Sequence, residues 1–546
     1  MKKKLIAVLL AAAMLVSLCS CGNTGSGTEA GGAQTQEAGG DDANTSGEKE
    51  PVTFTIAVDL HPLTKDEDFN NKEAFKMAEE ATGVHIEWMP IATSDAEDKV
   101  NIMLASDLPD AFLGTLLNES KISTNIDSFV NLAENDMLRT YAPHVVADYE
   151  TISGGLDRVT GPDGSIRSLI TGKQTSYEND AEGIMFMRKD WLDQLGLDVP
   201  TTTDEFYEVL CAFRDNDMNG NGDTTDEIPF LPSQSDWCSK IMNVANPWGI
   251  AGTDSSDSSA YLMVKDGQVT GTVNTEEFRD FLEYCNKLVQ EGLMDKEIFS
   301  QTSEQYHAKI NEGVVGCYYT WSPYADMSET EAENWVVVGA MSAPSGSGYT
   351  KTGSQDKFAG NRTGFAITTA CEAPERLLEW WDYLSSSTEI KYTCRLGAQG
   401  GAWDIDEEGN VYEKTPDDLT DDFNIENYKY TYGMVDVCPL ILKDETTRAS
   451  EEESYTSWYR EQCVDVVHDY CLPVENQLPI RFVDTEKMNE RTFIETELFS
   501  AIQTFIADSV INGIDDTSWN AYLEQLDALQ YNEWLQWYQD FVDGAF

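Results

Sequence analysis

The first folded part of the chain alternates between two patterns of apolar residues. Residues 52–60 (VTFTIAVDL) are rich in β-branched residues and partly alternate with polar ones, which predicts a strand. Residues 71–82 place alanines and a methionine at helical spacing, and Gly83 follows as a helix stop. Residues 84–91 (VHIEWMPI) predict a second strand, and residues 107–113 predict a turn followed by a third strand.

Strands that alternate with helices predict βαβ units and a mostly parallel sheet, so the expected fold class is α/β. A further helix is expected after Ser94, whose side chain would cap it, with Val100 and Ile102 in its apolar face. Loops at the carboxyl ends of parallel strands face a cleft. The turns at 60–62 and 113–114 are therefore where a ligand would be met.

The N-terminus has the pattern of an export signal. Lys2 to Lys4 precede an apolar run at 5–16 that is too short to span a bilayer, which indicates a signal peptide over residues 1–20. Leu18-Cys19-Ser20-Cys21 resembles the lipobox of bacterial lipoproteins, so Cys21 is expected to be lipidated. Residues 21–51 are rich in Gly and polar residues and predict a disordered tether. The sequence thus predicts a protein anchored by lipid to the extracellular face of the cell membrane.

Length and charge limit the function. Residues 52–546 are too many for one ordinary domain and suit two large lobes. A net charge of -61 repels nucleic acid and disfavours a polyanionic ligand, so a small neutral ligand is expected. We also expect the chain to act as a monomer.

The cysteines that follow Cys21 are odd in number and scattered, which does not indicate a disulfide framework. We expect most of them to be small buried hydrophobic residues, with a Cys463–Cys471 bridge left open. They are Cys211, Cys238, Cys285, Cys317, Cys371, Cys394, Cys438, Cys463 and Cys471.

One block of sequence resembles a known family. Residues 187–192 (MRKDWL), followed by 195–203 (LGLDVPTTT) and Asp204-Glu205-Phe206, are typical of bacterial extracellular solute-binding proteins that serve carbohydrate ABC transporters, in their large lipoprotein branch. Residues 106–113 and the C-terminal pattern from Phe505 to Phe541 are similar to the same family. The resemblance spans residues 52 to 546, and the block at 183–229 is its most specific part.

This resemblance implies a fold and a function. The fold would be the two-lobe type of periplasmic binding proteins (type II), with a hinge and a ligand cleft between the lobes. Residues 52–182 plus 357–402 would form lobe 1, and residues 183–356 plus 403–546 would form lobe 2. The protein would capture an oligosaccharide, although a peptide is left open, and deliver it to the permease subunits of an ABC importer.

An Asp- and Asn-rich segment at 215–227 follows directly on a predicted helix. Calcium loops place oxygen donors at alternate positions, with glycine at the sharp turn. Two registers fit, one starting at Asp215 and one starting at Asp217. The family pattern matches the second register, whose candidate ligands for a structural Ca²⁺ are Asp217, Asn219, Asn221, Asp223, Asp226 and Glu227. The alternative is a surface turn without an ion.

Sugar sites combine an aromatic platform with polar partners for the hydroxyl groups. Trp321 follows an apolar strand, and the resemblance implies a cleft position for it; Trp403 and Trp248 are further aromatic candidates in loops. The other candidate ligand contacts are Asp110, Asn361, Arg362 and Tyr324. The tryptophans at helical spacing or within the motif block are expected in the core, namely Trp88, Trp191, Trp381, Trp534 and Trp537.

Motifs of hydrolases and nucleotide-binding enzymes are absent from the folded part of the sequence. It contains no GxSxG, HExxH or P-loop pattern, and its five histidines are scattered. The 97 acidic residues make any pair of carboxylates uninformative about glycoside hydrolysis. We therefore predict a binding protein with no catalytic residues. The alternative is a secreted carbohydrate-active enzyme, either a glycosidase or a lyase.

Overall fold

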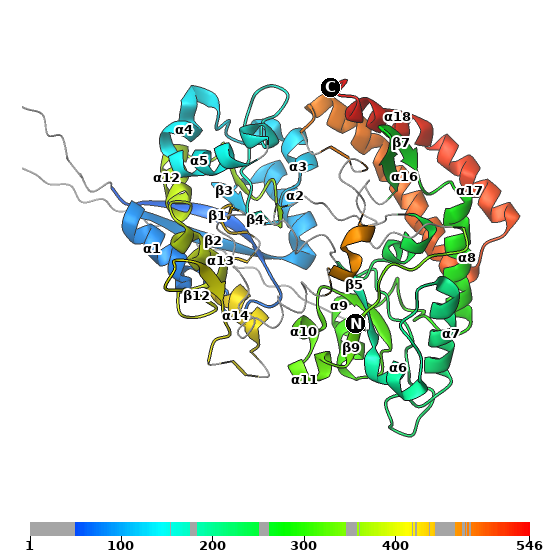
Figure 1. Ribbon diagram of the computed structural model, residues 1–546. Coiled ribbons are helices and arrows are strands. Elements are labelled where there is room, and N and C mark those ends of the chain that lie inside the picture. The colour runs from blue at the N-terminus through cyan, green and yellow to red at the C-terminus, as the bar shows by residue number, and fades with distance from the viewer. Residues whose placement is uncertain are drawn as a thin grey trace, which may run out of the picture. The chain divides into compact units, whose positions relative to one another are not determined.

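The computed structural model describes residues 50–152, 154–174, 183–250, 261–345, 358–359, 361–417, 419–420, 423–435, 437–442, 463, 465–471, 476, 478–479 and 482–546. Two large hydrophobic cores organise this part of the chain, and each surrounds its own sheet. The sheet of the first core is built from β11, β3, β1 and β2 in that order, and the sheet of the second core from β8, β5 and β9 (Figure 1).

The first sheet has the predicted parallel arrangement. Strands β1 (Val52–Leu60), β2 (Val84–Ala92) and β3 (Ala111–Leu113) run parallel, and β11 (Phe365–Ile367) joins β3 antiparallel. Alternation of side chains along β1 gives the sheet two buried faces. Phe54, Ile56 and Val58 enter one hydrophobic cluster, whereas Ala57 enters another on the opposite face. Three predicted strands and their parallel pairing are thus confirmed.

Helices cover the first sheet, and a small hairpin adds to its core. Helix α1 ends where the sequence predicts, because Gly83 adopts a left-handed conformation with φ of 68° and its N–H donates to Glu79 O at 2.8 Å. The helices are α1 (Glu73–Thr82), α2 (Ala96–Ser106), α3 (Glu119–Thr124), α4 (Met137–Tyr141), α5 (Pro143–Thr151), α12 (Pro374–Leu384), α13 (Thr388–Leu396) and α14 (Ile425–Tyr432). Short strands form the hairpin of β12 (Trp403–Ile405) with β13 (Val411–Glu413) and the pair of β4 (Lys173–Gln174) with β10 (Phe358–Ala359).

Two details of the predicted second helix are wrong. The residue that precedes α2 is Asp95 rather than Ser94, and neither side chain caps the helix with a hydrogen bond to its backbone. Ile102 is 65% exposed instead of lying in the apolar face, because Val100 is the buried residue of this helix.

The second sheet is antiparallel in its regular strands. Strand β5 (Ile184–Arg188) pairs on one side with β8 (Cys317–Thr320) and on the other with β9 (Trp335–Val337). Residues 228–231 add parallel bridges to this sheet. The remaining elements of this core are α6 (Lys189–Leu195), α7 (Thr203–Arg214), β6 (Leu262–Lys265), β7 (Gln268–Gly271), α8 (Glu276–Gln290), α9 (Ser303–Asn311), α10 (Pro323–Asp326), α11 (Glu329–Ala332), α16 (Thr485–Asn512), α17 (Asp516–Ala528) and α18 (Tyr531–Val542).

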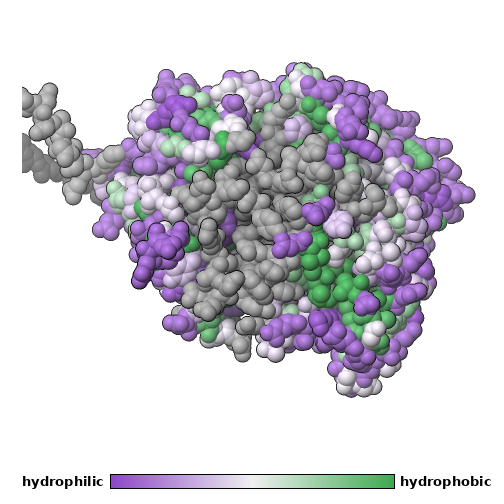
Figure 2. All heavy atoms as spheres, in the orientation of Figure 1, coloured by the Kyte–Doolittle hydropathy of each residue, from purple (hydrophilic) through white to green (hydrophobic). Residues whose placement is uncertain are grey.

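The predicted core tryptophans lie where their spacing places them. Trp381 packs in the first core, and Trp191, Trp534 and Trp537 pack in the second core. Trp88 is half-buried against the first core, where its Nε1–H donates to Asn70 Oδ1 at 3.0 Å. Hydrophilic residues dominate the rim of the face shown in Figure 2, as the strong acidic charge implies.

The chain between 403 and 442 packs differently from the predicted lobe boundary. Trp403, Val411 and Met434 enter the first core, although the prediction assigns them to lobe 2. Lys72 of the first core donates to three carbonyls at the end of α14, at 3.0 Å to Tyr430 O, 2.6 Å to Thr431 O and 2.9 Å to Gly433 O. Both observations favour a boundary after residue 442 rather than after residue 402.

Candidate functional site

The carboxyl end of β8 carries the first candidate aromatic residue. Trp321 follows β8 directly and is half-buried, and Tyr324 lies in the short helix α10 next to it with 9% of its surface exposed. The strand places Trp321 there because Thr320 is paired with Ile184, the first residue of β5. Trp321 is therefore held at the end of the second sheet where β8 finishes and β5 begins. This end is called the edge of the second sheet below.

A second chain segment reaches the same edge. Residues 228–231 run parallel to β8, with bridges from Ile228 to Val315 and from Leu231 to Tyr318, so residues 232–238 emerge beside Trp321. Gly183, just before β5, packs against this segment so closely that a Cβ there would lie 2.7 Å from Cys238 O. The segment carries Trp237, which is 58% exposed.

Trp237 is a candidate that sequence reasoning missed. Most tryptophans of this chain are buried, and a side chain this large that remains exposed marks a surface able to bind a partner. The available signal was its polar context, Ser233 to Asp236, which differs from the apolar neighbours of the core tryptophans.

Two carboxylates and a histidine lie at the same edge. His307, on α9, places Nε2 3.7 Å from Asp236 Oδ2 and Nδ1 3.7 Å from Asp326 Oδ1. Asp326 Oδ2 also accepts hydrogen bonds from Thr320 Oγ1 at 2.6 Å and Tyr318 OH at 3.1 Å. Asp236 Oδ1 accepts from the backbone N–H of Cys238 at 2.8 Å. Hydrogen bonds thereby fix both carboxylates. Asp236 precedes Trp237 in the chain, and Asp326 is bonded to Thr320, the residue before Trp321.

Burial gives these carboxylates unusual properties. Both side chains are nearly buried, and the loss of water raises the pKa of Asp236 and of Asp326. Fixed carboxylates in a dry setting are strong acceptors for hydroxyl donors. The edge therefore combines aromatic faces with carboxylates, which is the chemistry expected at a sugar site.

The predicted ligand tips of the first sheet also carry polar groups. Gly114, just after β3, has a φ of +107°, and a Cβ there would lie 1.8 Å from Asp59 Oδ1, so only glycine fits beside this carboxylate. Thr115 Oγ1 donates to Asp59 Oδ2 at 3.0 Å. His61, after β1, stacks on Tyr430 with ring centroids 3.7 Å apart. Burial lowers the pKa of His61 to about 4.

Three predicted polar contacts have structural partners. Asp110 precedes β3, at the edge opposite Gly114, and its Oδ2 accepts from Thr55 N at 2.7 Å and Thr55 Oγ1 at 2.9 Å. Asn361 Nδ2 donates to Gly114 O at 3.0 Å and Leu117 O at 2.9 Å. Arg362 forms an ion pair with Glu119 and lies over the Phe482 ring. These contacts hold the three side chains in place, and their contact with a ligand stays a prediction.

Two predicted aromatic contacts lie in cores. Trp403 is 0% exposed, and its Nε1–H donates to Gly397 O at 2.7 Å. Trp248 is buried against Phe281 and Tyr284, with ring centroids 5.8 and 5.2 Å apart. A loop position in the sequence does not reveal this, because the loops themselves are packed onto the cores. The burial favours a packing role over ligand contact for both residues.

The Asp- and Asn-rich segment forms a compact turn centred on Asp217. Asp217 Oδ1 accepts from Gly220 N at 2.8 Å and Asn221 N at 3.1 Å, and its Oδ2 accepts from Gly222 N at 2.8 Å. Asp215 instead pairs with Arg214 at 2.7 Å. This arrangement supports the register that begins at Asp217.

The same turn contains acceptors suited to a cation. Asp226 Oδ1 and Glu227 Oε2 are buried and have no hydrogen-bond partner among the described residues. Asn219 and Asn221 both direct their Nδ2 atoms to Asp226 Oδ2, at 3.3 and 2.6 Å, so rotated amides would present oxygen there instead. The donors, all oxygen, fit calcium. No cluster of three or more His, Cys, Asp or Glu in the described ranges is arranged for a metal.

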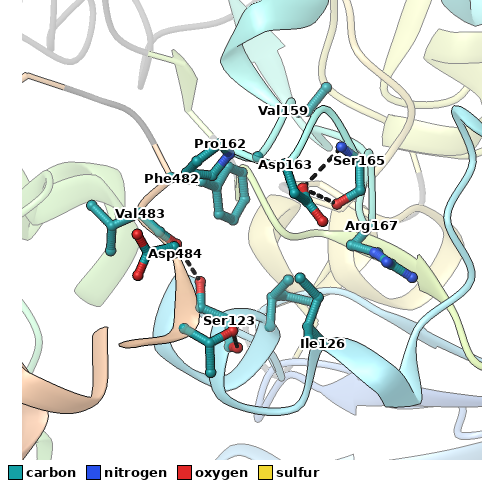
Figure 3. Close-up of a pocket in the computed structure, with 13 residues that line it drawn as sticks. Ser123, Ile126, Val159, Pro162, Asp163, Ser165, Arg167, Phe482, Val483 and Asp484 are labelled. Atoms are coloured by element: carbon teal, nitrogen blue, oxygen red, sulfur yellow. Dashed lines mark hydrogen bonds between the residues drawn. The ribbon is translucent and has the colours of Figure 1, made fainter. Parts of the chain in front are cut away.

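A separate cavity of about 150 Å³ lies between α3, the turn at 161–165 and residues 482–485 (Figure 3). Ser123 Oγ donates to Val483 O at 3.4 Å and Thr485 Oγ1 donates to Ser123 O at 2.7 Å, which ties the first core to the start of α16. Asp163 accepts from Ser165 N and Oγ. Ser123, Asp163 and Ser165 therefore form hydrogen bonds within the lining of this cavity.

Other predictions concern the cysteines and the membrane. Cys285, Cys317 and Cys394 are buried, as expected, and burial raises the pKa of each thiol. The structure joins no two cysteines of its described part by a disulfide, Cys463 and Cys471 included. Cys21 lies outside the described residues. Within the described ranges, every helix is too short or too polar to cross a bilayer.

Comparison with known proteins identifies relatives over most of the chain. Residues 73–399 match the family described as "Bacterial extracellular solute-binding protein". A protein of Streptococcus pneumoniae serotype 4, the fructooligosaccharide ABC transporter substrate-binding protein FusA, is 26% identical over 512 residues, which cover 91% of this chain and 90% of that protein. Lipoprotein LipO of Bacillus subtilis is 26% identical over 360 residues, or 63% of each chain.

Solved structures show the same fold. The S. pneumoniae protein FusA in complex with kestose matches with a TM-score of 0.77 and 24% identity, covering 90% of this chain and 99% of that chain. An EF-hand mutant of FusA in complex with fructo-nystose matches with a TM-score of 0.76 and 23% identity over the same shares. The fold is therefore the two-lobe α/β fold that the sequence predicts.

Proposed function

Because the chain belongs to the bacterial extracellular solute-binding proteins, we propose that it captures a neutral oligosaccharide and delivers it to the permease of an ABC importer. The observation that carries this proposal is the edge of the second sheet. Exposed Trp237 and half-buried Trp321 lie on the two parallel segments there. The aromatic faces would stack on sugar rings, and the polar groups that stay exposed at this edge would form hydrogen bonds with sugar hydroxyls.

A neutral ligand fits this edge better than an acidic one. Asp236 and Asp326 are nearly buried, so a ligand carboxylate placed beside them would meet two charges of its own sign with little water to screen them. The net charge of -61 adds to this repulsion at long range. The relative FusA, whose name refers to fructooligosaccharides, supports the same class of ligand.

Capture requires closure of the two lobes around the ligand. The second lobe would contribute the edge of the second sheet, with Trp237 and Trp321. The first lobe would contribute the carboxyl ends of β1 and β3 near Asp59 and His61. A ligand that contacts both lobes stabilises the closed form by its higher affinity for that form. The closed form is then recognised by the permease. Family membership favours transport over the alternative of a glycosidase or lyase.

The location and the oligomeric state follow from the same proposal. Cys21 would carry the lipid anchor, and residues 22–51 would tether the two lobes to the outer face of the membrane. The similarity to lipoprotein LipO supports this placement. We propose that one copy of the chain suffices, because both walls of the site come from the same chain.

A structural calcium ion in the turn at 217–227 is part of the proposal. The ion would be held by Asp217, Asp226 and Glu227 together with amide and backbone oxygens, and it would neutralise acceptors that are buried without partners. The EF-hand mutant of FusA among the similar structures supports this assignment. The ion would stabilise the turn at the end of α7.

The sugar-binding proposal is tested with alanine variants of the two tryptophans. Trp321→Ala and Trp237→Ala should each raise the Kd for kestose or nystose by about 30-fold or more, because truncating an aromatic anchor costs about 2 kcal/mol or more. Titration calorimetry measures the affinity, and thermal unfolding verifies that the fold is intact. Phe493→Ala is a matched control, because Phe493 is an exposed aromatic residue on α16 with 76% of its surface free.

The outcomes separate binding from other functions. Unchanged affinity in both tryptophan variants would reject the assignment of the site. Release of shorter sugars by the wild-type protein would reject the carrier function in favour of a glycosidase. Absence of binding to a broad panel of neutral oligosaccharides would reject the ligand class.

A further inference from the structure

Residues 233–239 form a closed loop, called the Trp237 loop below. Ser233 N donates to Ser239 O at 2.9 Å, and this hydrogen bond joins the two ends of the loop. Both serines are buried or half-buried, whereas Trp237 between them is 58% exposed. The loop therefore presents a large aromatic side chain from a folded base.

The Trp237 loop spans the end of β8 that Trp321 follows. On one side of β8 the loop begins after Leu231, which bridges to Tyr318 of that strand. On the other side, where β5 pairs with β8, Gly183 packs so closely on the loop that a Cβ there would lie 2.7 Å from Cys238 O. The loop and Trp321 therefore lie at the same end of the strand.

A buried amide is bonded to both of these segments. Asn243 is 2% exposed, and its Nδ2 donates to the carbonyl of Cys238, the residue after Trp237, at 2.6 Å. Its backbone oxygen accepts a hydrogen bond from the hydroxyl of Tyr319 at 3.1 Å, and Tyr319 lies on β8 two residues before Trp321. Asn243 thus links the two segments that carry the tryptophans.

We infer that Asn243 is a positioning residue, which fixes the Trp237 loop relative to β8 and thereby raises the affinity for an oligosaccharide. The inference rests on the proposed function and adds a residue that acts through Trp237 without touching the ligand. An aromatic side chain that is already held in place loses less conformational freedom when a sugar stacks on it. A loosened loop would have to be ordered by the ligand, and this cost appears as lost affinity.

The two arms of the loop are held by different contacts. The first arm is fixed by Gln301, whose Nε2 donates to Pro232 O at 3.1 Å, and by Gln234, whose N–H donates to Ile298 O at 2.9 Å. The second arm is fixed by Asn243. Without this amide, the buried carbonyl that it bonds would lose this donor, and that loss favours movement of the second arm toward water. The substitution Asn243→Ala should therefore loosen the second arm and leave the first in place.

The inference is tested with a double-mutant cycle read by titration calorimetry of kestose or nystose. Asn243→Ala should raise the Kd by about tenfold in the wild-type background, because the ligand must then order the loop. In the Trp237→Ala background the same substitution should raise the Kd by less than about twofold, because the side chain through which Asn243 acts is gone.

A second variant and two matched controls separate positioning from general stability. Tyr319→Phe removes the hydroxyl that bonds Asn243 and keeps the ring in the core, so it should also raise the Kd. In the same lobe, Asn286 Nδ2 donates to a carbonyl of α16 at 3.0 Å, and Tyr284 OH donates to a carbonyl of α7 at 2.8 Å. Asn286→Ala and Tyr284→Phe remove equivalent hydrogen bonds away from the loop and should leave the Kd unchanged.

Hydrogen exchange gives a readout that needs no ligand. In Asn243→Ala the Cys238 amide, on the second arm, should exchange faster, while the Gln234 amide, on the first arm, should keep its rate. Equal losses of affinity in both backgrounds, or an unchanged Kd in both Asn243→Ala and Tyr319→Phe, would overturn the inference and leave the proposed function intact. An unchanged exchange rate at Cys238 would also overturn it. A wild-type protein that binds no neutral oligosaccharide would overturn the proposed function and the inference together.

Discussion

Removal of calcium provides the sharpest test of the turn at 217–227. A chelator should lower the thermal stability of the protein, because Asp226 Oδ1 and Glu227 Oε2 would then remain buried without hydrogen-bond partners. A buried carboxylate oxygen without a partner is costly unless a cation compensates its charge. The ion is therefore expected to bind the folded state and not the unfolded state.

The magnitude follows from linkage. A loop site with a Kd of about 100 µM, as in extracellular calcium modules, stabilises the folded state by about 2.7 kcal/mol in about 10 mM calcium. The entropy of unfolding is about 2.1 cal/mol/K per residue, which amounts to about 1 kcal/mol/K for the whole folded part. The midpoint should therefore fall by about 3 °C if both lobes unfold together, and by about 5 °C if one lobe unfolds alone.

The assay is thermal unfolding with and without calcium, together with calcium titration of the chelated protein. Asp217→Asn should abolish the calcium-dependent shift, since Asp217 accepts three backbone N–H groups at the centre of the turn. Asp215→Asn is the matched control, because Asp215 pairs with Arg214 outside the turn. Identical melting curves with and without chelator would refute the calcium assignment. Loss of the calcium-dependent shift in Asp215→Asn as well as in Asp217→Asn would indicate the register that begins at Asp215.

Two further predictions concern packing and acid stability. Trp403→Ala should reduce the free energy of unfolding by about 3–5 kcal/mol in urea titrations, because the substitution removes a fully buried indole. Trp237→Ala truncates an exposed tryptophan and should change the free energy of unfolding little. Equal losses in the two variants would contradict the roles assigned to them. The pKa of His61 is about 4 in the folded protein and about 6.5 when unfolded, so the unfolded chain binds more protons between these values. Stability should therefore fall by up to about 3 kcal/mol as the pH drops from 6.5 to 4, and His61→Gln should flatten that part of the pH profile.

Local patterns were sufficient for the three parallel strands of the first sheet, but not for β11, which joins from a distant part of the chain. The strands at 52–60, 84–92 and 111–113, and the helix stop at Gly83, follow from neighbours along the chain. Trp381 and Trp534 were also placed correctly in cores, because helical spacing fixes which side chains share a face. The family and its two-lobe fold followed from the motif block near residues 187–206.

The ligand contacts could not be derived in the same way. Asp110 and Asn361 carry suitable side chains, yet their hydrogen bonds are made with Thr55 and with backbone carbonyls distant in sequence. Trp403 lies in a loop-like sequence but is fully covered by the first core. A side chain's type and local spacing do not state whether a distant segment will cover it.

The sequence by itself determined the three parallel strands of the first sheet, the class of fold and the presence of a donor-rich turn, because these depend on residues close together along the chain. Only the tertiary structure decided which aromatic residues remain accessible and which carboxylates meet. Asp236, His307 and Asp326 come from three separate segments, and they lie together because residues 228–231 run alongside β8 and α10 follows that strand. Burial and proximity of this kind arise from packing between distant segments, which no local pattern encodes.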